Sequence, residues 1–190
     1  FIQTVKNIAP TFGGINLEDI KAPESFEIER RLVEELNIPV MHDDQHGTAI
    51  ISSAALLNAL ELANKKIEDV KLVVSGAGSA ALACSNLYVL LGVKLENIIM
   101  FDSHGILSDD RTDLSDLQRR YCRGEKGKLL KEALVNADVF LGLSAGNILT
   151  PEMLLVMAND PIVFAMANPT PEIDYNLAIA TRKDIIMATG

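Results

Sequence analysis

The sequence has few cysteines and no long apolar run, which argues against a disulfide-rich or membrane-spanning protein. It contains only two cysteines, Cys84 and Cys122, and their spacing matches neither a zinc motif nor a disulfide framework. No apolar run reaches the roughly 18 residues that a transmembrane helix needs, and we expect no basic-then-apolar leader. The sequence therefore predicts a cytoplasmic protein with no membrane partner.

Positive charge is also scarce. The chain has 17 lysines and arginines against 26 aspartates and glutamates, which gives a net charge of −9. Because phosphate binding depends on a high density of lysine and arginine, this balance argues against a nucleic-acid partner. An acidic protein can still contain a local cationic pocket, so a small-molecule substrate is compatible with the charge.

The residues that are present suffice for a globular core. Hydrophobic residues make up 48% and charged residues 23%, which are ordinary values for a globular protein. The length of 190 residues suggests one domain, or one complete domain plus part of another. The chain begins at Phe1 without an initiator methionine and stops at Gly190 just after an apolar run, so we expect a fragment of a longer protein. We predict a division into residues 1–64, a partial domain, and residues 65–190.

The second part alternates between strand and helix patterns. The predicted elements are short apolar strands and intervening helices, interrupted by a polar surface insertion at 108–128. The strands are 70–74, 97–101, 139–143, 162–165 and 185–187, and the helices are 80–91, 129–136, 151–157 and 173–180. Apolar strands separated by helices predict an α/β fold with a doubly wound parallel sheet, Rossmann-like in kind.

The first part is harder to assign. Residues 1–12 mix apolar and polar types without a clear period. Residues 23–36 predict a helix with Pro23 at its first position, and 38–41 predict a strand. We expect residues 42–46 to form a turn, because Gly47 argues against a helix there. A helix over 47–62 should follow.

A glycine-rich turn links the first strand of the second part to its helix. Gly76, Gly78 and Ala81 have the spacing of the dinucleotide fingerprint: a tight turn, a close backbone approach to the pyrophosphate, and close helix–strand packing. The helix N-terminus would then face the anion. The predicted cofactor-binding stretch is Gly76, Ala77, Gly78, Ser79, Ala80 and Ala81. The alternative is a plain packing turn.

Asp102 ends the next predicted strand, at about the place where a ribose-binding acid belongs. A carboxylate there would repel a 2′-phosphate and would favour NAD. Ser103 and His104 could instead accommodate that phosphate, so NAD and NADP both stay open. The alternative reading is a strand-end aspartate that caps a turn.

Two acidic pairs, Glu18-Asp19 and Asp43-Asp44, supply the oxygen ligands that Mg²⁺ or Mn²⁺ prefers. Capping of the predicted helix 47–62 explains the second pair equally well. A zinc site at His42 and His46 is disfavoured, because the two side chains share a face only if the segment is helical.

Five motifs in order resemble the malic enzyme family, in its shorter bacterial type, over nearly the whole chain. They are Gly13–Ile20, His42–Ala49, Gly76–Gly78, Leu149–Met153 and Ala167–Glu172. The resemblance implies oxidative decarboxylation of L-malate to pyruvate and CO₂ with NAD or NADP and a divalent metal. Residues 1–64 would then be a metal- and substrate-binding segment, and 65–190 the NAD(P)-binding domain.

The resemblance also implies individual roles. Glu18, Asp19 and Asp44 match the metal ligands, and Asp43 matches an acid that helps to set the catalytic lysine. The remaining matches are Asn168, near nicotinamide and malate, and Ser144-Ala145, in a loop that lines the cofactor. The family's tyrosine acid and lysine base come from a region absent from this sequence, and neither Lys6 nor Lys21 lies in the matching motif. We therefore expect the isolated fragment to be inactive.

Two other classes compete with this reading. A non-catalytic NAD(P)-binding regulatory module would bind cofactor without metal-dependent turnover. A non-decarboxylating dinucleotide-dependent dehydrogenase would not need clustered acidic ligands, so the two acidic pairs favour the malic enzyme. We also expect a homo-oligomer.

Overall fold

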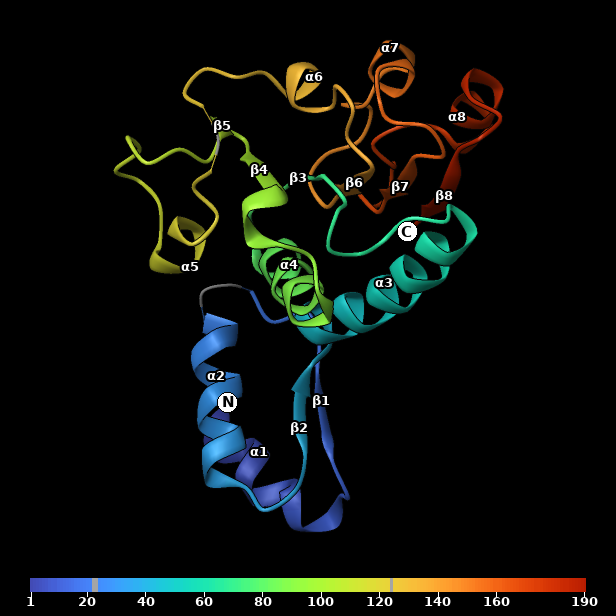
Figure 1. Ribbon diagram of the computed structural model, residues 1–190. Helices are drawn as coiled ribbons and strands as arrows, with labels where there is room; N and C mark the ends of the chain where they lie inside the picture. Colours follow the sequence, from blue (N-terminus) through green and yellow to red (C-terminus); the bar gives the residue numbers. More distant parts are fainter. Residues whose placement is uncertain (22–23, 124) are drawn as a thin grey trace.

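The computed structural model describes residues 1–21, 24–123 and 125–190, and it has two lobes joined by a long helix (Figure 1). The expected first helical position, Pro23, lies outside these residues. The small lobe contains α1 (Ile2–Ile8), the 3₁₀ turn η1 (Ala9–Thr11), β1 (Ile15–Leu17), α2 (Glu24–Glu35) and β2 (Val40–His42). The long helix α3 (Asp43–Leu62) begins where β2 ends and runs into the larger lobe.

A parallel pair of strands organises the small lobe. β1 pairs with β2, with Leu17 opposite His42. Val5, Leu17 and Leu32 are buried together and pack α1, β1 and α2 into one small core. Because β1 and β2 are parallel, the residues that follow both strands meet at the same edge, and these are the two acidic pairs.

The larger lobe contains the remaining elements. They are β3 (Leu72–Ser75), α4 (Ser79–Leu91), η2 (Leu95–Asn97), β4 (Ile98–Asp102), β5 (Gly105–Ile106), α5 (Asp116–Arg119), α6 (Leu130–Ala133), β6 (Val139–Gly142), α7 (Pro151–Leu155), β7 (Ile162–Ala165), α8 (Tyr175–Thr181) and β8 (Ile186–Thr189). The five predicted strands are all present, and their apolar, β-branched sequences explain why they form the buried centre of the lobe.

The strands form one six-stranded sheet in the order β5-β4-β3-β6-β7-β8. Every pairing is parallel except the short hairpin between β4 and β5. The chain passes from β3 to β4 on one side and then returns to place β6 on the other side. The strand order therefore reverses between β3 and β6, which is where open α/β sheets bind ligands.

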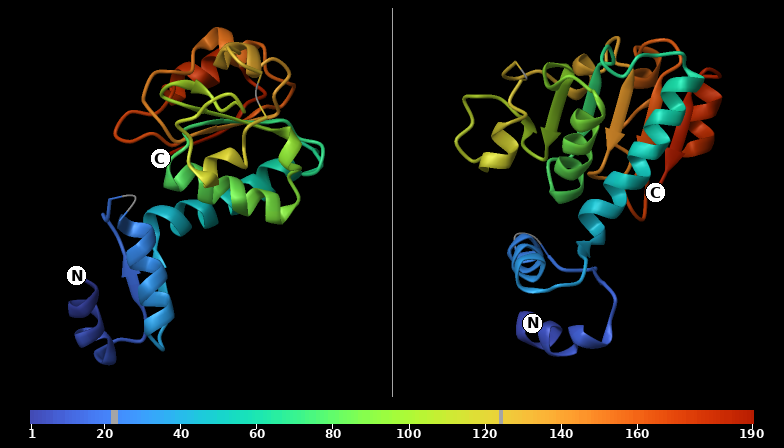
Figure 2. Two further views of the ribbon diagram at one scale, coloured as in Figure 1. Left: turned by 90° about the vertical axis from the view of Figure 1, so that its left-hand side faces the viewer. Right: turned by 60° about the horizontal axis from the view of Figure 1, so that its bottom comes forward.

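Helices cover both faces of the sheet, as the doubly wound prediction requires. In β3, Leu72 and Val74 face a core shared with α3 and α4, whereas Val73 faces a core shared with α6, α7 and α8. Figure 2 shows α3 and α4 side by side on one face and the later helices on the other. In the part of the chain that the structure describes, no helix combines the length and hydropathy needed to span a bilayer.

The structure differs from the local predictions, or adds to them, in three places. The segment 42–46 is not a turn, because α3 begins at Asp43 and includes Gly47. The stretch 1–17 contains a helix and a strand that its mixed pattern did not predict. The expected surface insertion 108–128 sends Tyr121 and Cys122 into the core beneath α4, at 0% and 2% exposure.

Candidate functional site: a crevice at the sheet switch point

A crevice of about 650 Å³ opens at the carboxyl ends of β3, β4 and β6. It brings together the glycine turn, Asp102 and the Ser144-Ala145 loop, which are far apart in the sequence. Its lining residues are Ser75, Gly76, Ala77, Gly78, Asp102, Ser103, His104, Asp113, Leu114, Gln118, Leu143, Ser144, Ala145 and Ile148. Ser79, Ala80 and Ala81 follow directly in the first turn of α4.

The two glycines of the turn differ in what surrounds them. Gly76 has φ +122°, and a Cβ there would lie 2.5 Å from the carbonyl oxygen of Leu143. Gly78 is exposed and has ordinary φ and ψ, and a Cβ there would meet nothing within 4 Å. The protein itself therefore requires a glycine at 76, whereas the space beside Gly78 is open for a ligand.

Gly78 is also the N-cap of α4, and no side chain makes a capping hydrogen bond at this end of the helix. The first backbone N–H groups of a helix have no partner within the helix and carry the positive end of its dipole. Open space next to uncapped amides is the arrangement that accepts a phosphate or pyrophosphate. The glycine turn therefore fits a dinucleotide in both shape and charge.

Asp102 ends β4 beside the crevice, and Arg111 holds it. The guanidinium donates to both carboxylate oxygens, at 2.8 and 2.7 Å, and the backbone N–H of His104 donates to Oδ1 at 2.8 Å. Partial burial raises the pKa of Asp102, but the hydrogen bonds from Arg111 and His104 outweigh burial and keep the pKa below its usual value. Asp102 is therefore a fixed, charged acceptor, with a cation that the sequence analysis did not identify.

Asp102, His104 and Asp113 offer ligand atoms that all lie within 4.8 Å of one another, the one such group among residues 1–21, 24–123 and 125–190. Arg111 donates to Asp113 as well as to Asp102, at 2.5 Å from Nη2 to Oδ2. A guanidinium that bonds both carboxylates already offsets one of their two negative charges, so we interpret this group as an ion-pair network rather than a metal centre.

The predicted metal ligands lie at the junction of the two lobes. Glu18 and Asp19 follow β1, and Asp44 lies in the first turn of α3; all three are exposed. The backbone N–H of Asp19, which has φ +57°, donates to Oδ2 of Asp44 at 3.2 Å. Asp19 and Asp44 are thus adjacent, although the three carboxylates are not gathered into one shell. Their oxygen chemistry suits a hard divalent cation.

Asp43 explains the glycine inside α3. A Cβ at Gly47 would lie 2.5 Å from Oδ1 of Asp43, so the glycine leaves room for this carboxylate one turn earlier. His42, the N-cap of α3, makes no capping hydrogen bond with its side chain. Asp43 and Asp44 therefore favour the helix through its dipole and not through N-cap geometry.

Glu29 of α2 fixes the start of α3, a role that no sequence motif signalled. Its Oε1 accepts from the backbone N–H of His42 at 2.9 Å and lies 2.9 Å from Nε2 of His46. Within the described residues, both ring nitrogens of the buried His42 lack a hydrogen-bond partner. The two histidines therefore have different surroundings: His42 is buried, whereas His46 is exposed and lies against Glu29.

The loop after β6 lines the crevice through Ser144 and Ala145, whereas Asn168, in the loop after β7, is not among its lining residues. Ser144 and Ala145 follow β6, and Asn168 follows β7; all three are exposed. The hydroxyl groups of Ser75 and Ser144 lie 2.9 Å apart and join the ends of β3 and β6 across the switch point. Glu172 packs under both loops and has 0% exposure. The sequence analysis named it only as the last residue of the motif Ala167–Glu172.

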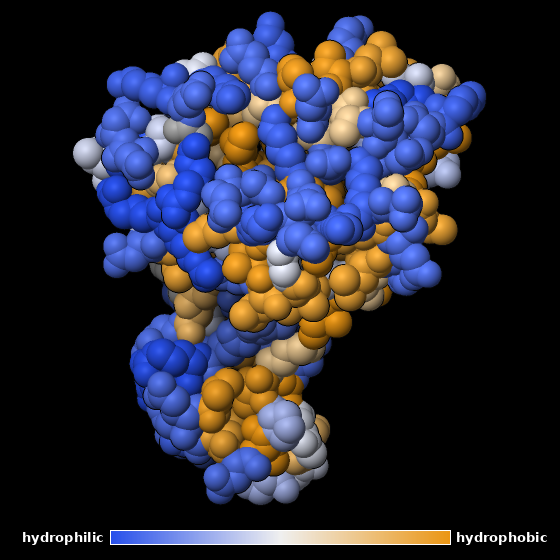
Figure 3. Space-filling view, viewed as in Figure 1, coloured by the Kyte–Doolittle hydropathy of each residue, from blue (hydrophilic) through white to orange (hydrophobic). Residues whose placement is uncertain are grey.

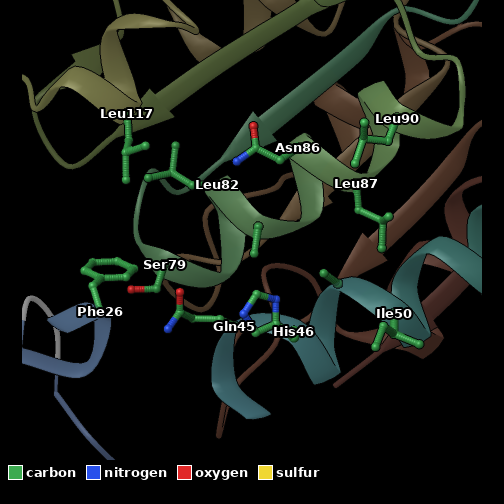
Figure 4. A pocket seen from close by; sticks show the side chains of 12 residues that line it. Phe26, Gln45, His46, Ile50, Ser79, Leu82, Asn86, Leu87, Leu90 and Leu117 are labelled. Carbon is green, nitrogen blue, oxygen red and sulfur yellow. The ribbon is translucent and has the colours of Figure 1, made fainter. Parts of the chain in front are cut away.

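A second, more apolar crevice lies between α3, α4 and the start of α2. Figure 4 shows Phe26, Gln45 and Ser79 at one end, with Ile50, Leu87 and Leu90 farther along the two helices. The crevice is lined by Phe26, Gln45, His46, Ala49, Ile50, Ser79, Leu82, Ala83, Asn86, Leu87, Leu90 and Leu117. None of the predicted cofactor residues except Ser79 lines it.

The parallel doubly wound sheet, with a glycine turn and a helix N-terminus at its switch point, defines a dinucleotide-binding α/β protein of the Rossmann kind. Comparison with family models identifies the family. Residues 45–190 match the model described as "Malic enzyme, NAD binding domain", and residues 1–33 match "Malic enzyme, N-terminal domain". The chain belongs to the malic enzyme family.

Individual relatives agree with this assignment. The whole chain is 52% identical to the NADP-dependent malic enzyme of Halomonas elongata over 190 residues, and 53% identical to an NAD-dependent malic enzyme of Rhizobium meliloti. It spans 45% and 25% of the lengths of these relatives. The crystal structure of the NAD-dependent malic enzyme of Thermotoga maritima superposes with a TM-score of 0.87 at 48% identity, and the chain covers 51% of it.

Proposed function

We propose that the chain is part of a longer malic enzyme that converts L-malate and NAD(P)⁺ to pyruvate, CO₂ and NAD(P)H. The observation that carries the proposal is the open, amide-lined space beside Gly78 at the switch point of a family-matched domain. Relatives named for NAD and for NADP share about half of the residues, which supports the cofactor class. The adjacent acidic side chains at the lobe junction support the metal requirement.

The two parts of the chain would divide the work. We assign metal and substrate binding to residues 1–64 and cofactor binding to residues 65–190. α3 belongs to the first part by its acidic start. Its later residues Leu56, Ala59 and Leu60 lie in the core shared with α4 and the sheet. Such a helix would keep the acidic pairs at a fixed position relative to the cofactor crevice.

In the cofactor half, the chain's own residues bind and orient. The amides of Gly78, Ser79, Ala80 and Ala81 would donate to the pyrophosphate, and Asp102 would accept from the adenosine ribose. Since β6 and β7 lie on the other side of β3 from β4, the nicotinamide half would extend over Ser144, Ala145 and Asn168. NAD(P)⁺ supplies the hydride acceptor.

In the metal half, Glu18, Asp19 and Asp44 would supply oxygen ligands, and Asp43 would help to position the catalytic base. When bound, Mg²⁺ or Mn²⁺ supplies Lewis-acid polarisation of the substrate oxygens. The hydrogen bond from the Asp19 amide to Asp44 would orient one of these ligands.

The test is an assay of the full-length protein with L-malate, NAD⁺ or NADP⁺, and Mn²⁺. Asp44→Ala should lower metal-dependent turnover by at least about 100-fold, since the metal stabilises transition-state charge by several kcal/mol. Asp69→Ala, at a side chain that is 66% exposed, is the matched control. Cofactor binding without malate turnover in the wild type would instead support the regulatory-module alternative. Near-native activity of Asp44→Ala at low Mn²⁺ would show that Asp44 is not a metal ligand.

We further propose a cytoplasmic homo-oligomer. Cys84 and Cys122 are free and buried, which supports a reducing compartment. Apolar side chains gather on the outer faces of α3 and α4, visible in Figure 3 below the sheet, and they include Ile51, Leu62 and Leu90 at 68%, 77% and 82% exposure. Sedimentation velocity of the full-length protein measures the oligomeric state.

A further inference from the structure

Glu172 is the one acidic residue among the buried polar groups of the described residues, and it is fully buried. It follows β7 and lies beneath the floor of the crevice. Its Oε1 accepts from the backbone N–H of Ser144 at 3.1 Å, and its Oε2 accepts from the backbone N–H of Ala167 at 3.0 Å. One carboxyl group thus joins the chain just after β6 to the chain just after β7.

The surroundings of Glu172 are built to hold this group in place. A Cβ at Gly142, the last residue of β6, would lie 2.6 Å from Oε1 of Glu172. The backbone adds two further links between the loops, because Leu149 N–H donates to the carbonyl of Glu172 at 2.9 Å and Asn147 N–H to that of Pro171 at 3.0 Å. Burying a polar group is costly unless it is hydrogen-bonded, so these hydrogen bonds favour this placement of the carboxyl group.

The contacts continue into the crevice. Ser144, whose amide Glu172 holds, places its hydroxyl 2.9 Å from that of Ser75 at the end of β3. Ala167, the other partner, directly precedes the exposed Asn168. Glu172 therefore determines where the β6 and β7 loops stand relative to the switch point. Asp102 ends β4, on the side of β3 away from β6, and the glycine turn follows β3 itself; neither makes a hydrogen bond with Glu172.

We propose that Glu172 is a positioning residue for the nicotinamide half of the cofactor. Through backbone amides it sets the β6 and β7 loops, while it touches neither cofactor nor substrate. The inference rests on the proposed cofactor function. It predicts that a variant without both acceptor oxygens binds the whole dinucleotide more weakly but keeps its affinity for the ADP-ribose half.

The test is Glu172→Gln in the full-length protein, titrated with NAD⁺ and separately with ADP-ribose. The glutamine has nearly the same shape, but its NH₂ would face a backbone N–H and replace one acceptor by a donor. NAD⁺ affinity should fall about tenfold, the change expected when a buried donor loses its partner, while ADP-ribose affinity stays within about twofold. Glu61→Gln, at an exposed position on α3, makes the same chemical change as a control and should alter neither titration.

The outcomes separate the two proposals. Equal losses for both ligands would show that Glu172 only maintains the fold, and no loss for either would show that it positions nothing; each result overturns the inference. A wild-type protein that binds neither ligand overturns the proposed cofactor function and the inference with it. If Glu172→Gln does not fold, the same titrations of Glu172→Asp decide the question. That variant keeps both acceptor oxygens but is one methylene shorter, and it should show the same split.

Discussion

Gly76 and Gly78 stand in the same turn, yet the structure needs them for different reasons. At Gly76 the backbone is left-handed and a side chain would collide with Leu143, whereas at Gly78 the space is empty. Gly78→Val should therefore leave the fold intact and weaken binding of both NAD⁺ and NADP⁺, because the side chain would fill the place of the pyrophosphate. Cofactor titration by fluorescence, beside a thermal unfolding curve, measures both effects.

Gly76→Ala is the matched comparison. It should lower the free energy of unfolding by at least about 1 kcal/mol, because alanine is disfavoured at positive φ and its methyl would contact backbone. A Gly78→Val variant that loses stability while Gly76→Ala does not would contradict the assignment of the two glycines.

Asp102 and Arg111 offer a second contrast at this scale. Asp102→Ala would remove the ribose acceptor and would leave the guanidinium of Arg111 with Asp113 as its remaining carboxylate partner. NAD⁺ should lose a hydrogen bond, while a 2′-phosphate should gain a cation and lose a repelling charge. The ratio of NADP⁺ to NAD⁺ affinity should rise, measured as two dissociation constants for each protein. An unchanged ratio would show that Asp102 does not bind the adenosine ribose and only caps a turn at the end of its strand.

Part of the site could be predicted from the sequence because its chemistry is local. The glycine turn and Asp102 sit at fixed offsets from strand ends, so their patterns are visible in the chain. Arg111, Glu29 and Glu172 carry no such offset. Each acts on residues that only the folded chain brings near: Glu29 reaches across the lobe to His42, and Glu172 joins the ends of two strands.

At the scale of elements, the five parallel strands were predicted correctly because each is a short, continuous apolar run. The start of α3 was predicted wrongly because glycine usually weakens a helix. At Gly47, space for the Asp43 carboxylate outweighs that intrinsic preference. β1 escaped prediction because three residues carry little pattern, and its partner β2 lies beyond an intervening helix.

Arg182 ties α7, α8 and β8 together at the far edge of the sheet. Its guanidinium donates to the carbonyls of Leu154 and Met157, at 2.9 and 3.0 Å, and to both oxygens of Asp184. The hydrogen bonds from Arg182 lower the pKa of Asp184 to about 2, against partial burial that would raise it. The carboxylate therefore keeps its charge well into acid.

This pair predicts a pH-dependent contribution to stability. The folded pKa of Asp184 is about 2, and an unfolded aspartate titrates near 3.9. A lowered pKa stabilises the folded state above the unfolded value and loses its effect as pH falls through the folded value. Wild type should exceed Asp184→Asn in unfolding free energy from pH 7 to about pH 4, and the difference should narrow toward pH 2. Urea unfolding at several pH values measures it, and a constant difference would contradict the pairing.

At the scale of the molecule, α3 is the helix that connects the two lobes. Its first turn carries Asp43 and Asp44, and its later turns pack into the core shared with α4 and β3. The open side of α3 and α4 exposes several leucine and isoleucine side chains. The helix therefore links the acidic residues at its start to the lobe that contains the crevice at the sheet switch point, and α3 and α4 leave apolar side chains exposed.

The isolated 190-residue chain should bind cofactor but should not oxidise malate. The cofactor crevice lies wholly within the larger lobe, whose core is continuous and buried, so NAD⁺ or NADP⁺ should still bind. The resemblance to the family implies a tyrosine acid and a lysine base, and the sequence analysis matched no residue of this chain to either. Each positioned acid or base typically contributes about 10²–10⁴-fold to rate. The purified chain should therefore bind the cofactor, measured by fluorescence. With saturating cofactor, L-malate and Mn²⁺ it should form no NAD(P)H above the rate of the same mixture without protein. Robust turnover would mean that an acid and a base lie within these residues, with Lys6 and Lys21 the first candidates to substitute.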